Sequence, residues 1–172
     1  MRLRPDPRTL PRDAFADRFG GVLEHSRWAA EAAWDAGLPA DADTPAGLAE
    51  ALWAQVEAAG PDAQRTLLRA HPDLAGRLAL AGGLTAESTA EQAGAGLDRC
   101  GPDELAEFQA LNARYVARFG FPFIVAVKGL DRAAILALFR RRVEAAPEAE
   151  FAEALAQVRR IARLRLDAMA EG

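Results

Sequence analysis

Residues suited to metal binding and to covalent or redox catalysis are scarce in this sequence of 172 residues. It contains one cysteine, Cys100, one lysine, Lys128, one tyrosine, and two histidines, His25 and His71. A single cysteine cannot form an internal disulfide, a redox pair or a thiolate metal cage, and two histidines without HExxH spacing argue against a zinc site. We therefore expect no metal, no disulfide and a reducing, cytoplasmic setting.

Long apolar runs and a basic surface are also missing. No apolar stretch reaches the roughly 18 residues of a membrane span, and the opening residues, MRLRPDPRTLPRD, lack the apolar core of a secretory signal. The formal net charge of -4 argues against general nucleic-acid binding, which needs cationic residues to replace the counterions of the phosphates. We expect neither a membrane nor a nucleic acid among the partners.

Alanine, by contrast, is abundant, β-branched residues are few, and 51% of the chain is hydrophobic. This composition favours helices around a buried core. Caps, prolines and apolar spacing predict helices over residues 11–19, 24–36, 45–59, 62–70, 86–96, 102–119, 131–146 and 148–169. The apolar stretch FPFIVAV lacks helical spacing, and Pro122 keeps the residue before it extended. The expected fold is all-α, a single-domain bundle over residues 1–172 of about eight helices, with one short extended apolar segment near 121–127 and a flexible arm over residues 1–10.

His71 is the histidine better placed for proton transfer. It follows the predicted helix 62–70 and precedes Pro72, which restricts the backbone of His71 to extended conformations and fixes its imidazole at the corner between two helices. A general acid or base needs such fixed geometry together with a near-neutral pKa. The structural alternative is a helix-end histidine that interacts with the last carbonyl groups. His25, among capping residues at a helix start, is better explained by a local hydrogen bond.

The segment LTAESTAEQ allows two interpretations. Ser88 and Glu91 have the spacing of a capping box, in which each side chain satisfies a backbone N–H group of the other residue. Ser88, Glu91 and Gln92 would also share one helix face, where they present a hydroxyl, a carboxylate and an amide together. From these residues alone, capping is the favoured interpretation.

Two further features place polar groups in apolar surroundings. Arg165 falls on an apolar stripe of the last helix, with Leu155, Val158, Ala162 and Met169. A charge turned inward needs an anionic partner, either an internal carboxylate such as Glu91 or that of a ligand, unless the side chain runs along the surface to solvent. The segment 121–127 has no strand to pair with, so its backbone needs other partners, either a polar ring ligand or side chains and water.

Five motifs, in order, resemble those of one family: GGVLEHSRW, HPDLAG, LTAESTAEQ, LNARYVARFGFPFIVAVKG and EALAQVRRIARLRL. The family is the 2-oxo-4-hydroxy-4-carboxy-5-ureidoimidazoline (OHCU) decarboxylases of urate breakdown, and the resemblance covers nearly the whole chain. Arg27 departs from it, since the first motif more often has proline there. The resemblance implies an all-α, cofactor-free carboxy-lyase, often a homodimer, that converts OHCU to S-(+)-allantoin and CO2.

The resemblance also implies the site. His71 would be the general acid or base, assisted by Glu91. The substrate would be held by Pro72, Ser88, Gln92, Arg165 and the backbone of Phe123, Ile124, Val125, Ala126 and Val127. The competing interpretation is a non-catalytic helical module that binds a metabolite or a protein partner. A small helical redox enzyme is disfavoured, because Cys100 has no second cysteine to pair with.

Overall fold

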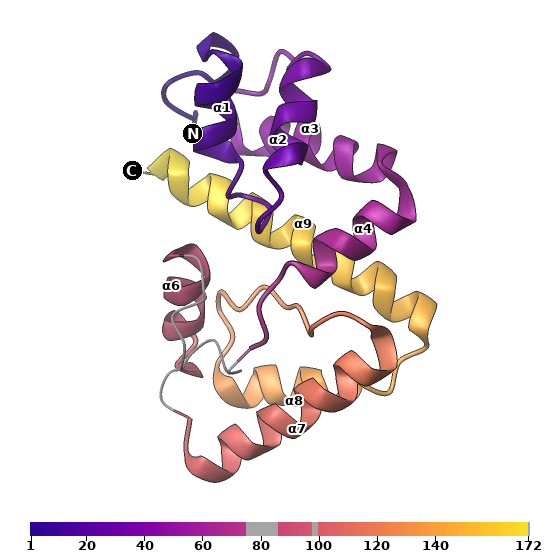
Figure 1. The fold of residues 1–172 in the computed structure, drawn as a ribbon. Helices are drawn as coiled ribbons and strands as arrows, with labels where there is room; N and C mark the ends of the chain where they lie inside the picture. The colour runs from indigo at the N-terminus through magenta and orange to yellow at the C-terminus, as the bar shows by residue number, and fades with distance from the viewer. Residues whose placement is uncertain (75–85, 98–99, 172) are drawn as a thin grey trace. The chain divides into compact units, whose positions relative to one another are not determined.

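The chain divides into two compact units in the computed structural model, which describes residues 1–74, 86–97 and 100–171. One unit comprises Met1–Ala70 and Val158–Gly172, and the other comprises His71–Gln157. Within the described residues there are eight α helices, one short 3-10 helix and no strand, which confirms the predicted all-α class (Figure 1). None of the helices in these ranges is long and apolar enough to cross a membrane.

The first unit contains several short helices and the C-terminal part of one long helix. Its elements are η1 (Pro7–Thr9), α1 (Arg12–Phe19), α2 (Arg27–Asp35), α3 (Pro45–Ala58), α4 (Gly60–Arg69) and α9 (Pro147–Glu171) from Val158 onward. Consecutive helices pack on one another, α1 on α2, α2 on α3 and α3 on α4 (Figure 1). Their buried side chains include Phe15, Phe19, Leu48, Leu52, Val56, Leu67 and Leu68.

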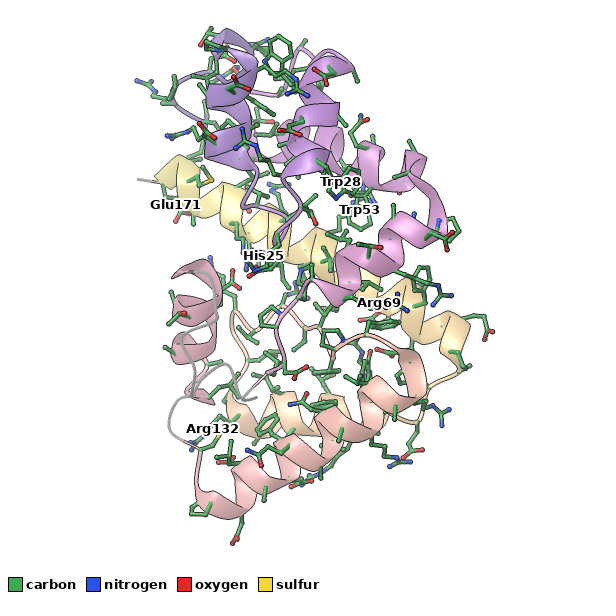
Figure 2. All side chains as sticks on the ribbon, in the orientation of Figure 1. His25, Trp28, Trp53, Arg69, Arg132 and Glu171 are labelled. Atoms are coloured by element: carbon green, nitrogen blue, oxygen red, sulfur yellow. The ribbon has the colours of Figure 1, made fainter. Side chains whose placement is uncertain are left out.

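Local signals explain several helix boundaries in this unit. The Thr44 hydroxyl accepts a hydrogen bond from the N–H of Gly47 at 3.0 Å, which caps α3 as predicted. Gly60 has a φ of 79°, a conformation that glycine adopts readily, and it turns the chain from α3 into α4. Helix α2 begins at Arg27 and not at residue 24, because His25, on the preceding loop, has a left-handed φ of 49° (Figure 2).

Residues 1–10 pack on the first unit and do not form the arm that was expected. Leu3 is 2% exposed, and its N–H donates to the carbonyl of Asp43 at 2.7 Å. Arg8 pairs with Asp6 at 2.7 Å and also donates to the carbonyl of Ala40. The partners of this segment lie in the loop before α3, so local composition could not reveal them.

The second unit contains α6 (Ala86–Gly94), α7 (Pro102–Phe119), α8 (Arg132–Arg142) and α9 as far as Gln157. Helices α7 and α8 pack side by side (Figure 1). Gly120, with a φ of 77°, ends α7 and leads into residues 121–127, which are buried and have no helical or strand structure, as predicted. Asp131 caps α8 with its side chain, and the helix ends before residue 146.

An aromatic cluster forms the core of the second unit. The ring of Tyr115 lies 4.6 to 5.9 Å, centroid to centroid, from those of Phe119, Phe121, Phe123 and Phe139. Phe123 stacks on Phe139 at 3.9 Å with an interplanar angle of 10°. Buried aromatic rings contribute much of the energy of a small core. The cluster therefore fastens the extended segment to α7 and α8.

Candidate functional site

His71 lies directly beyond the end of α4, as predicted. Helix α4 ends at Arg69 with Ala70 as its C-cap, and the residue His71 is 8% exposed. The following residues, Pro72 and Asp73, are not helical. Residues 75–85, which follow Leu74, lie outside the described residues. The imidazole is therefore buried at a helix end, where little water can reach it.

Asn112, which the sequence interpretation missed, anchors the chain just after His71. Its Nδ2 donates to the carbonyl of Leu74 at 2.8 Å, and the side chain is buried. Its Oδ1 is also buried and accepts no hydrogen bond within the described part of the chain. A signal was available, because Asn112 is the polar member of the buried stripe of α7, with Phe108, Tyr115 and Phe119.

Helix α6 carries Ser88, Glu91 and Gln92. It begins at Ala86, so Ser88 lies inside the first turn and is not the N-cap that a capping box requires. The backbone therefore supports the other interpretation, in which positions i, i+3 and i+4 share one helix face. The Glu91 side chain is partly exposed. The side chains of Ser88 and Gln92 lie outside the described residues.

The backbone of the segment 121–127 is held partly by side chains. Arg142 Nη1 donates to the carbonyl of Ile124 at 2.7 Å. The N–H of Ala126 donates to Gln157 Oε1 at 2.9 Å. Side chains therefore supply partners on this part of the segment, which is the structural alternative considered for it.

A buried ion pair that the sequence interpretation missed holds Arg142 in place. Arg142 Nε and Nη2 donate to Glu150 Oε1 at 2.9 and 2.6 Å, and the Tyr115 hydroxyl donates to the same oxygen. The side chains of Arg142 and Glu150 are 6% and 2% exposed. Burial, and then the hydrogen bond to Glu150, raises the pKa of Tyr115 well above its usual value, so the phenol stays protonated. Arg142 belongs to the buried stripe of α8, with Ile135, Leu136 and Phe139.

Arg165 lies inside the apolar face of α9, as predicted, while Arg159, Arg160 and Arg163 are exposed. Arg165 Nη1 donates to Glu24 Oε2 at 2.8 Å and lies 3.3 and 3.5 Å from the carbonyl oxygens of Gly21 and Val22. The side chains of Arg165 and Glu24 are 6% and 1% exposed. Glu24 is thus an internal carboxylate that neutralises the guanidinium, and it was not among the predicted partners.

The candidate residues are divided between the two units. His71, Pro72, Glu91 and the segment Phe123–Val127 belong to the second unit, and Arg165 belongs to the first. The second unit therefore contains a buried imidazole, a carboxylate on a helix face and a buried extended backbone. These groups are able to transfer protons and to bind the amide edges of a polar ring. In the described ranges no group of three or more His, Cys, Asp or Glu residues could hold a metal ion.

Comparison with known proteins gives matches that cover the same residues. A family model described as OHCU decarboxylase matches residues 8–167. The 2-oxo-4-hydroxy-4-carboxy-5-ureidoimidazoline decarboxylase of Haloferax volcanii is 43% identical over 91% of this chain and 89% of its own length. The mouse protein of the same name is 40% identical over 88% of this chain and 84% of its own. A crystal structure of (S)-allantoin synthase superposes with a TM-score of 0.74 at 36% identity, covering 95% of this chain and 52% of that one.

Proposed function

Because this chain belongs to the OHCU decarboxylase family, we propose that it removes CO2 from OHCU and releases S-(+)-allantoin in urate breakdown. The observation that carries the proposal is the extent of the family match, which includes every candidate site residue from His71 to Arg165. The proposal also makes the protein a carboxy-lyase that works as a cytoplasmic homodimer.

The substrate itself provides the electron sink for this reaction. OHCU has a carboxylate and a hydroxyl on C4, next to a C5=N double bond. When the bond between C4 and the carboxylate breaks, its electron pair forms a C4=C5 bond, and the C5=N pair moves to the ring nitrogen, which takes up a proton. The resulting enol loses its hydroxyl proton as C5 gains one, which gives allantoin. The protein must therefore supply orientation and proton transfer, without pyridoxal, thiamine or metal.

The proposal assigns these tasks to named residues. Neutral His71 contacts the C4 hydroxyl and moves its proton, with Glu91 orienting or polarising the imidazole. The burial of His71 supports this role, because a proton-transfer group works best where bulk water is excluded. The ureido and ring amide groups bind to Pro72, Ser88, Gln92 and the backbone of Phe123–Val127, and Arg165 binds the substrate carboxylate.

The rate of CO2 release tests the proposed activity. OHCU is generated in situ from urate with urate oxidase and hydroxyisourate hydrolase, and CO2 is followed with and without this protein. We expect faster release with the protein, and a fall in kcat of at least about a hundredfold in His71→Asn, as for a lost general acid or base. Cys100→Ser and Lys128→Ala serve as controls and should keep the wild-type rate.

Each outcome has a distinct meaning. An unchanged rate of CO2 release in the presence of the wild-type protein would refute the proposed activity. Stabilisation by the ligand without turnover would support the binding module instead. Near-normal turnover by a folded His71→Asn protein would remove His71 from the mechanism, while leaving the activity itself in place.

A further inference from the structure

Two side chains make hydrogen bonds to the backbone along one edge of the extended segment 121–127, where a neighbouring strand would make them in a sheet. In an extended chain, alternate residues direct their N–H and C=O groups to opposite edges. The Ile124 carbonyl and the Ala126 N–H, two residues apart, therefore share an edge. Arg142 Nη1 binds the first at 2.7 Å, and Gln157 Oε1 binds the second at 2.9 Å. One carbonyl and one N–H group of this edge are thus held by side chains of the protein itself.

The opposite edge is formed by Phe123, Val125 and Val127, and the Val127 carbonyl accepts the N–H of Leu130 at 2.9 Å. Phe123 and Val125 are buried, at 0% and 6% exposure. Within the described ranges, no hydrogen bond is made to the backbone of either residue. Buried N–H and C=O groups need partners, so this edge suits a ligand with its own amide groups. The proposed substrate has such groups in its ring and in its ureido arm.

Several contacts besides its hydrogen bond to the Ile124 carbonyl hold the Arg142 side chain in place. Its guanidinium binds Glu150 through two nitrogens, and its carbon lies 4.6 Å from the centroid of the Phe123 ring. Tyr115, fully buried, donates to the same Glu150 oxygen. The fork of arginine has a rigid planar geometry, so these contacts determine where its remaining nitrogen points.

Stability alone does not account for this arrangement. Apolar residues of similar volume usually stabilise a core as well as a buried ion pair does, because the pair loses its hydration. An apolar side chain at position 142 would, however, leave the Ile124 carbonyl without its donor. A requirement that the segment 123–127 keeps a fixed position explains why Arg142 and Glu150 are present in this core.

We propose that Arg142, Glu150, Tyr115 and Gln157 are positioning residues that hold one edge of the segment 123–127, so that its other edge can bind the substrate ring. This inference rests on the proposed function and adds residues that do not touch the substrate. Arg142 and Gln157 bind the backbone of the segment, and Glu150 acts through Arg142. Tyr115 acts through its hydrogen bond to Glu150 and by packing on Phe123.

Arg142→Lys is the main test. Lysine keeps the positive charge beside Glu150 but has no planar fork to bind Glu150 and the Ile124 carbonyl together. We expect the KM for OHCU to rise about tenfold, with a smaller change in kcat, as for lost binding that is equal in the ground and transition states. The matched control is Arg140→Lys on the same helix, whose partner Glu107 lies on the surface, and its KM should stay at the wild-type value.

Amide hydrogen exchange of the peptide covering residues 122–128 gives a readout that does not depend on turnover. We expect faster exchange in Arg142→Lys and in Gln157→Leu than in the wild type and in Arg140→Lys. Gln157→Leu removes the acceptor of the Ala126 N–H, together with the Gln157 Nε2 donor to Glu153 Oε1 at 2.7 Å, and leaves Arg142 unchanged. It therefore carries the test if Arg142→Lys fails to fold.

Folded variants that keep both the wild-type KM and the wild-type exchange would overturn the inference. A lowered Tm with unchanged KM would equally reduce these residues to a structural role. If the wild-type protein does not accelerate CO2 release, the proposed function fails on that result alone, and the exchange measurement still shows whether Arg142 and Gln157 hold the segment.

Discussion

Replacing Glu24 with glutamine tests how much the buried pair with Arg165 contributes to the stability of the fold. The two side chains are 1% and 6% exposed, and their charged atoms lie 2.8 Å apart. Glutamine keeps the size of the side chain but removes its charge, which takes the Glu24 carboxylate away from a guanidinium in an apolar face. Breaking such a pair from one side costs about 3–5 kcal/mol.

The surroundings of Arg165 place the expected cost near the lower end of that range. The carbonyl oxygens of Gly21 and Val22, at 3.3 and 3.5 Å, still face the guanidinium after the substitution. We therefore expect Glu24→Gln to lose about 3 kcal/mol of unfolding free energy. For a chain of this length, the corresponding fall in Tm is roughly 6–12 °C.

Urea unfolding followed by far-UV circular dichroism measures this loss. Arg163→Gln is the matched control on the same helix, because its i,i+4 pair with Asp167 is exposed, and it should cost no more than about 0.5 kcal/mol. The double variant Glu24→Leu with Arg165→Met should recover most of the stability, since both charges are then removed together. A Glu24→Gln protein as stable as the Arg163→Gln control would refute the reasoning.

Two further predictions concern the helices. Gly120→Ala should lose about 1–2 kcal/mol in the same urea experiment, because Gly120 ends α7 with a φ of 77° that alanine adopts only with strain, and wild-type stability would contradict this. Asp35 should contribute to the pH dependence of stability, because its hydrogen bond to Arg12 lowers the pKa of this carboxyl. A lowered folded-state pKa means that the contribution is present above the unfolded pKa of about 4 and is lost as pH falls through the folded value. Asp35→Asn should therefore weaken the acid dependence of urea unfolding, and an unchanged dependence would count against the pair.

The helices could be predicted from local sequence, whereas the partners of the buried charges could not. Helix α7 runs from Pro102 to Phe119, the predicted bounds, because proline and Gly120 mark its two ends. The inward direction of Arg165 also followed from helical spacing. Its partner Glu24 lies 141 residues away, in a turn whose left-handed residue, His25, no periodic pattern indicates. Arg142 could have been found by the reasoning applied to Arg165, since it too falls on a buried stripe.

For similar reasons, some residues of the candidate site could be predicted from the sequence and others could not. A proline after a histidine is a local signal, and His71 lies where it indicates. The buried and extended character of residues 121–127 followed from Pro122 and from an apolar run without helical spacing. The side chains that hold this segment come from α8 and α9, and contacts between distant elements depend on tertiary packing that local spacing does not encode.

The handedness of the product tests the central claim most directly. OHCU decays unaided to racemic allantoin, so an enzyme that delivers a proton to one face of C5 must produce an excess of one enantiomer. With OHCU generated in situ, the circular dichroism of the allantoin formed should show the S-(+) enantiomer when this protein is present and no signal when it is absent. Racemic allantoin, formed at an unchanged rate in the presence of the folded protein, would contradict the account.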